Sequence, residues 1–208
     1  MEAAGETAVY DTMKRPLFLM ALLVFLFSSC ATTKLTAVWE APNFHGTIRK
    51  IVVTGTFRTP VIRNLFEDDF VNRLKDYGVE AVASYTIIPI DKVQDKDYVM
   101  KRIKETGADA VLMTRLIDKK TERTYVPGTV YTVPNYYRRW GYYYDYIYSP
   151  GYTVDEEYAY AETNIYTLSN EEMIWSARSR TVISGTDENL IKAFVKTISD
   201  RLSADGVI

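Results

Sequence analysis

Hydrophobic residues recur along the chain at two spacings, one typical of strands and one typical of helices. Residues 49–56 form a β-branched run of the kind found in a strand covered on both faces. Thr59 and Pro60 then mark the start of a helix that continues to Gly78. Its apolar stripe has helical spacing and consists of Val61, Ile62, Leu65, Phe66, Phe70, Leu74 and Tyr77.

The same order of elements follows once more. Residues 79–88 predict a second strand, Asp95 is placed to cap a helix that ends at Gly107, and residues 110–117 predict a third strand. Two strand-helix-strand units with short connections predict a parallel sheet with right-handed crossovers.

After residue 157 the pattern becomes antiparallel. Residues 158–168 and 173–184 are extended segments joined through the turn residues 169–172, which is the pattern of a hairpin. Residues 188–202 predict a closing helix, and residues 35–40 fit an edge strand. The expected fold class is therefore α/β, a mixed sheet in two or three layers, built as one domain over residues 47–208.

Residues 125–157 interrupt this domain with a tyrosine-rich insertion. They contain ten of the 17 tyrosines, and residues 129–133 and 142–148 are suited to pair as an antiparallel ribbon. Aromatic and arginine side chains favour contact surfaces, so the expected partner contacts are Tyr136, Tyr137, Arg138, Arg139, Trp140, Tyr142, Tyr143, Tyr144, Tyr146 and Tyr148. Three alternatives stay open: packing over the sheet, protein or self-association, and contact with glycan or membrane.

The N-terminal region has the order of an export signal. Lys14 and Arg15 precede the apolar residues 17–27, and Ser28 and Ser29 lead to Cys30. This order resembles a bacterial lipobox, which implies cleavage before Cys30 and lipid on its sulfur and amine. Residues 1–12 then precede the true start, 13–29 are the signal peptide, and 30–46 form a lipidated tether. An uncleaved anchor and a core helix are the alternatives, but the apolar run is much shorter than the roughly 20 residues that cross a bilayer.

Composition narrows the classes of partner. Residues 1–29 contain three of the 27 acidic and two of the 25 basic residues, so the remainder is close to neutral. A neutral chain is unsuited to nucleic acid, which proteins bind mainly through excess basic charge. Cys30 is the only cysteine, so no intramolecular disulfide can form.

Candidate catalytic residues are few. His45 is the only histidine, and we expect it in a surface loop. Neither a metal site nor a cofactor motif is apparent, since no glycine-rich phosphate loop follows a strand. The acidic groups 67–69, 155–157 and 171–172 are expected on solvated faces. The sequence therefore favours a protein without enzymatic activity, with an envelope hydrolase or a glycan-binding lipoprotein as the alternative.

The predicted domain resembles a group of bacterial envelope proteins. The stretches that carry the resemblance are residues 48–57, 101–122, 173–182 and 190–202. They look like the N-terminal domain of TolB, the periplasmic domain of CsgG-type lipoproteins, and envelope lipoproteins of unknown function. The resemblance implies binding or assembly in the cell envelope, with no active-site residues to transfer. Ala31 after Cys30 implies anchoring to the outer membrane, with the domain in the periplasm.

Overall fold

The computed structural model describes residues 33–57, 59–128, 130–131, 147–148 and 151–208, and the expected α/β class is confirmed. In chain order the elements are β1 (Thr33–Glu40), β2 (Lys50–Thr56), α2 (Pro60–Lys75), β3 (Glu80–Ala83), the 3-10 turns η1 (Ser84–Thr86) and η2 (Ile90–Lys92), α3 (Lys96–Glu105), β4 (Ala110–Val126), β5 (Val130–Tyr131), β6 (Ile147–Tyr148), β7 (Tyr152–Thr167), β8 (Met173–Val182) and α4 (Asp187–Ala204).

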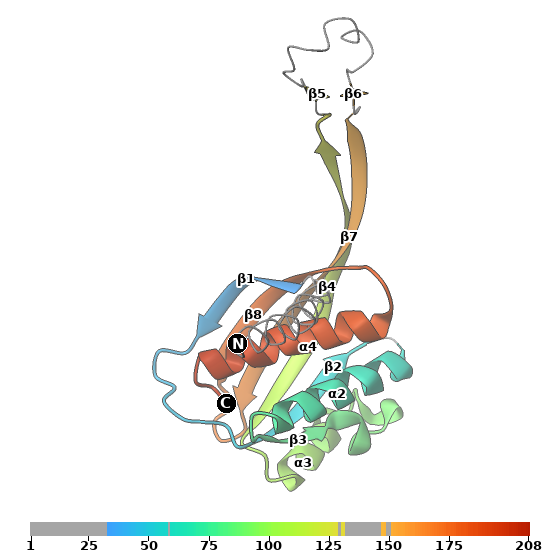
Figure 1. Cartoon of the computed structure of the whole chain (residues 1–208). Helices are drawn as coiled ribbons and strands as arrows, with labels where there is room; N and C mark the ends of the chain where they lie inside the picture. Colours follow the sequence, from blue (N-terminus) through green and yellow to red (C-terminus); the bar gives the residue numbers. More distant parts are fainter. Residues whose placement is uncertain (1–32, 58, 129, 132–146, 149–150) are drawn as a thin grey trace, which may run out of the picture. The chain divides into compact units, whose positions relative to one another are not determined.

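Six of the strands form one mixed sheet in the order β1-β8-β7-β4-β2-β3 (Figure 1). The predicted parallel part is present, because β2 pairs in parallel with both β3 and β4. The predicted hairpin is also present, since β7 and β8 pair antiparallel, and β1 is the edge strand beside β8. β4 and β7 pair antiparallel along almost their whole length.

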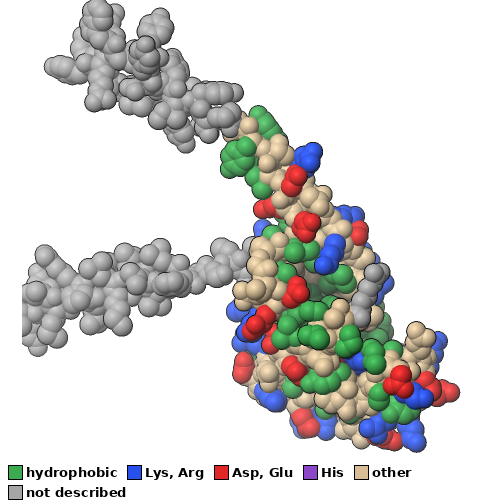
Figure 2. All heavy atoms as spheres, turned by 90° about the vertical axis from the view of Figure 1, so that its right-hand side faces the viewer, with side chains coloured by type: hydrophobic (Ala, Val, Ile, Leu, Met, Phe, Trp, Pro, Cys, Tyr) green, Lys and Arg blue, Asp and Glu red, His purple; other side chains and the backbone are tan. Residues whose placement is uncertain are grey.

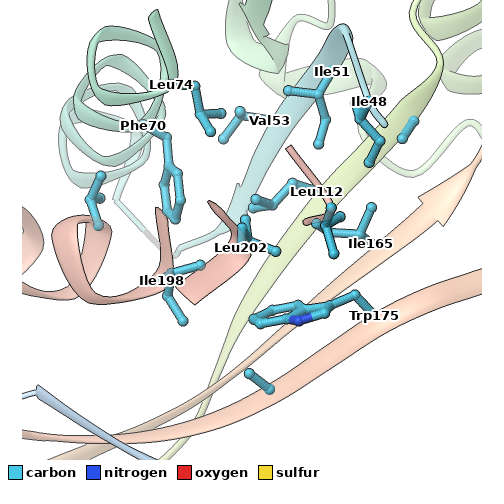
Figure 3. Close-up of a cluster of buried hydrophobic side chains, with 14 of the residues drawn as sticks. Ile48, Ile51, Val53, Phe70, Leu74, Leu112, Ile165, Trp175, Ile198 and Leu202 are labelled. Atoms are coloured by element: carbon cyan, nitrogen blue, oxygen red, sulfur yellow. The ribbon is translucent and has the colours of Figure 1, made fainter. Parts of the chain in front are cut away.

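Alternate residues of the central strands face different helices. Ile51 and Val53 of β2 point into a core made with α2 and α4, whereas Val52 points to a smaller core that includes Ile103 of α3. Figure 3 shows the larger core, in which Phe70 of α2 and Ile198 of α4 lie over the sheet. The parallel strands therefore lie between two helical layers.

The second parallel strand is shorter than predicted. Residues 79–88 were expected to be extended, but β3 ends at Ala83 and the chain turns at Ser84–Thr86. The turn has a specific cause, because Ser84 Oγ and the backbone N–H of Tyr85 both donate to the buried carboxylate of Glu67. Val61 also departs from the predicted apolar stripe, since it is 71% exposed.

Asp200 links the two helices that cover the larger core. Its carboxylate accepts hydrogen bonds from Arg73 at 2.9 Å, from Tyr77 at 2.5 Å and from Lys196 at 2.6 Å. Burial works to raise the pKa of Asp200, but the hydrogen bonds from Lys196, Tyr77 and Arg73 outweigh it and lower the pKa to about 2. The ionised carboxylate therefore stabilises the contact between α2 and α4.

Replacing the carboxylate of Asp200 should make the free energy of unfolding less dependent on pH in the acidic range. Because Asp200 is partly exposed, we expect Asp200→Asn to lower the free energy of unfolding by only about 1 kcal/mol at neutral pH. The folded-state pKa lies below the ordinary value of 3.8, so this stability is present above that value and is lost as the pH falls toward about 2. Urea unfolding of both proteins across this range measures the difference. An equal difference at neutral pH and at about pH 2 would contradict the prediction.

Candidate functional site

Strands β4 and β7 continue past the strands on either side of them. β2 pairs with β4 only as far as Arg115, and β8 pairs with β7 only from Tyr158. Beyond these points, residues 121–126 and 152–157 pair with each other, and the structure describes no third strand beside them. We call this two-stranded extension the arm (Figure 1). At about 3.4 Å per residue, its six residue pairs span about 17 Å.

Polar contacts of two tyrosines fix the base of the arm to the sheet. The Tyr160 hydroxyl donates to one oxygen of Glu122 at 2.5 Å, and Arg180 donates to the other at 3.2 Å. The Arg180 guanidinium also lies 4.2 Å from the ring centre of Tyr158, a favourable cation–π distance. The hydrogen bond to Glu122 raises the pKa of Tyr160 above its ordinary value. The base is thus held against β8.

The far end of the described arm is aromatic and exposed. Tyr125 is 65% exposed and Tyr152 is 58% exposed. Nearer the sheet, Arg123 donates to both carboxylate oxygens of Asp155 at 2.8 and 3.1 Å, and this hydrogen bonding lowers the pKa of Asp155. Figure 2 shows charged side chains along the lower part of the arm and hydrophobic ones at its described end. Charge and aromatic character are therefore separated along the arm.

A cavity of about 580 Å³ lies between α3 and the sheet, near the carboxyl end of β2. Its walls are mainly apolar and include Ile88, Val99, Ile103, Val111 and Leu168. Its volume falls within the usual range of ligand sites, and the carboxyl ends of parallel strands are where α/β folds commonly bind ligands. The cavity is therefore a second candidate site.

Arg63 lines this cavity and belongs to a buried polar cluster. Its Nε donates to Glu67 Oε1 at 2.9 Å, and its Nη2 donates to Ser84 Oγ at 2.8 Å. Glu67 is fully buried and also accepts from the backbone N–H groups of Gly55 and Tyr85 at 3.1 and 2.8 Å. Both carboxylate oxygens are thus occupied by internal donors, which makes Glu67 a structural acceptor.

A polar cavity of about 290 Å³ lies where β1 ends, and it is lined by Glu40, His45 and Asp205. A hydrogen bond to Asp205 raises the pKa of Glu40. Burial works to raise the pKa of Asp205, but hydrogen bonds from Arg201 and Trp175 outweigh it and keep this pKa low. Two carboxyl groups with separated pKa values are an arrangement found in acid–base catalysis. Here, however, Arg201 and Trp175 already occupy Asp205.

Among the described residues no cluster of histidine, cysteine, aspartate or glutamate is arranged to hold a metal ion. In the same part of the chain, none of the helices combines the length and the hydropathy needed to cross a membrane.

Comparison with known proteins gives structural neighbours only. No family model matches the chain, and no curated protein matches it. The PelC dodecamer from Paraburkholderia phytofirmans is 14% identical, with a TM-score of 0.44 over 80% of this chain and 95% of that chain. Lipoprotein GNA1162 from Neisseria meningitidis is 13% identical, with a TM-score of 0.41 over 74% and 98%. The neighbours thus include a bacterial lipoprotein, but likeness at this level carries no functional information about this chain.

Of the residues expected to contact a partner, the structure describes only Tyr148. Tyr148 lies in β6, where it pairs with Val130, and Tyr131 pairs with Ile147, as the predicted ribbon requires. The other expected contacts lie outside the described residues: Tyr136, Tyr137, Arg138, Arg139, Trp140, Tyr142, Tyr143, Tyr144 and Tyr146. Cys30 also lies outside them. His45 is exposed in the loop after β1, as expected.

Two features of the site differ from the sequence-based prediction. Glu67 was expected on a solvated face, but it is completely buried. The sequence could have indicated this burial, because Glu67 lies on one helical stripe with three other buried residues: Arg63, Phe70 and Leu74. Among residues 155–157, Glu156 is half-buried and accepts a hydrogen bond from the Tyr158 hydroxyl, whereas Asp155 and Glu157 are exposed as expected.

Proposed function

We propose that this chain is a lipid-anchored protein of the bacterial cell envelope that acts as a non-enzymatic interaction or assembly module. Cys30 carries the lipid, the outer membrane holds it, and the folded domain lies in the periplasm. The observation that carries the proposal is the arm, a two-stranded extension that ends in the exposed rings of Tyr125 and Tyr152. The register places the two rings on opposite faces of the ribbon, and large exposed aromatic side chains on a projecting element favour a contact surface.

The arrangement of charged groups supports the non-enzymatic part of the proposal. Asp155 of the arm is paired with Arg123, and its lowered pKa does not suit a general acid. One carboxyl pair suited to the alternative of an envelope hydrolase, Glu40 and Asp205, lies at the opposite end of β1 from the arm. Asp205 is bound there by Arg201 and Trp175.

The accessibility of the arm in cells tests the proposal. Because Cys30 is the only cysteine and is expected to be acylated, a single thiol can be introduced by Tyr152→Cys. In cells we expect a small hydrophilic maleimide to label it about tenfold more slowly than in detergent-solubilised protein, as a surface covered about 90% of the time would be. The matched control is Val61→Cys on α2, which is 71% exposed and lies off the arm. Equal labelling of Tyr152→Cys in cells and in detergent would contradict the proposal.

A further inference from the structure

The first residue of β1 and the base of the arm lie in one row across the sheet. Thr33 is paired with Thr181, Thr181 with Ala159, and Ala159 with Lys119. A hydrogen bond of 2.9 Å between the hydroxyls of Thr33 and Thr181 fixes the start of β1 in this row. Only β8 separates β1 from β7, a distance of about 10 Å, or two strand spacings. The chain therefore enters the domain beside the arm.

From this row, β1 and the arm run in opposite directions. β1 runs from Thr33 to Glu40 into the body of the sheet, whereas β4 runs from Lys119 outward to Val126 (Figure 1). The covalent chain that leads from Thr33 back to Cys30 thus begins at the end of the sheet from which the arm projects.

The chain between Cys30 and Thr33 is about half as long as the projecting part of β4. Three residue steps separate Cys30 from Thr33, and a fully extended chain covers at most about 11 Å in that interval. Seven residue steps along β4 from Lys119 to Val126 cover about 24 Å. If the acyl chains of Cys30 lie in a bilayer, an arm that points toward this bilayer must reach it.

The opposite orientation is costly. An arm that pointed away from the membrane would force β1 and the body around it into the lipid. Lys34 and Glu40 of β1 are exposed, and transfer of such charged groups into lipid costs several kcal/mol. The arm therefore points toward the membrane or lies along it.

Side-chain chemistry along the arm suits this placement. The charged residues of the arm all lie in the half nearer the sheet: Glu122, Arg123, Asp155, Glu156 and Glu157. The described end has Tyr125, Val126 and Tyr152, and no charged residue follows Arg123 in the sequence until Arg138. Tyrosine is enriched at membrane–water interfaces because its ring prefers lipid while its hydroxyl remains hydrated.

We propose that the end of the arm, with Tyr125, Val126 and Tyr152, rests in the interface of the same bilayer that holds the acyl chains of Cys30. The inference rests on the lipid anchor of the proposed function and names the partner of the arm as a lipid surface. Anchor and arm then hold the domain at two points about 10 Å apart at their bases, which fixes its orientation on the membrane.

Depth-dependent quenching in vesicles tests this placement. Purified full-length acylated protein carrying Tyr152→Cys, labelled with an environment-sensitive fluorophore, is reconstituted into phosphatidylcholine vesicles without any other protein. We expect a blue-shifted emission that nitroxide near the glycerol backbone of the lipid quenches more than nitroxide at the end of the acyl chain, because interfacial groups lie about 5–10 Å into the boundary. The same label at Val61→Cys should be unshifted and unquenched.

The outcomes separate the inference from the proposed function. If Tyr152→Cys is protected in cells but its label is unquenched in vesicles, the arm binds a protein or a glycan. The inference then fails while the proposed function stands. If the mass of the reconstituted protein shows no acyl groups, the anchor itself is refuted. A label at Tyr152→Cys and a label at Val61→Cys that are quenched equally would also refute an arm-specific contact.

Discussion

Replacing Glu67 with alanine is expected to lower the free energy of unfolding by about 3–5 kcal/mol, which is the usual cost of removing one partner of a buried ion pair. Glu67 is fully buried, and its oxygens accept from the side chains of Arg63 and Ser84. They also accept from the backbone N–H groups of Gly55 and Tyr85. The alanine variant leaves a buried guanidinium without its counter-charge, and it leaves the buried N–H of Gly55 and the part-buried N–H of Tyr85 without acceptors. Urea or thermal unfolding of the purified protein measures the loss.

A matched set of variants distinguishes the ion pair from simple packing. Glu67→Gln keeps the size of the side chain and one good acceptor, so it should cost clearly less than Glu67→Ala. The double variant Arg63→Met with Glu67→Leu removes both charges together. It should recover the part of the loss that comes from the unpaired guanidinium, while the N–H groups of Gly55 and Tyr85 still lack their acceptor. If the double variant is as unstable as the sum of Arg63→Met and Glu67→Leu, the two residues are not energetically coupled and the account of the cluster is wrong.

The elements around the cluster could be predicted from the sequence, but the burial of Glu67 was not predicted. The strand at 49–56 and the helix that begins at Pro60 could be predicted because their hydrophobic spacing is regular. Glu67 could not be placed in the core from its residue type, since an isolated carboxylate belongs in water. Its burial becomes favourable through the ion pair with Arg63 and through the tertiary hydrogen bonds from Gly55, Ser84 and Tyr85. The hydrogen bonds from Ser84 and Tyr85 also end β3 early.

A ribbon was expected farther along the insertion, at residues 129–133 and 142–148, but the strands of the arm itself were not predicted, for a related reason. Residues 118–123 are rich in charge and show no alternation of apolar and polar positions, so the third strand was predicted to end at residue 117. The structure continues it to Val126, because charges on β4 and β7 pair across the strands, as Arg123 does with Asp155. Likewise, the cavity under α3 depends on the distance between the helix and the sheet, which periodicity does not specify.

We expect Cys30→Ala to move the chain from the membrane fraction to the soluble fraction of cells when residues 13–29 are also replaced by an export signal that is cleaved without lipidation. Acyl chains contribute about 0.8 kcal/mol for each buried CH₂ group, and stable anchoring needs two such signals, so an arm alone should not hold the domain. Immunoblots of fractionated cells measure the distribution. The matched control is Ala31→Ser, which keeps the cysteine and should stay with the membrane. Cys30→Ala protein that remains in the membrane fraction would show that another segment anchors the chain.

The most direct test of the lipid anchor is mass spectrometry of the N-terminal peptide of the native protein. We expect a chain that begins at Cys30, with a diacylglycerol on the sulfur and an acyl group on the amine. A chain that retains residues before Cys30, with an unmodified thiol, would contradict the anchor and with it the orientation inferred for the arm.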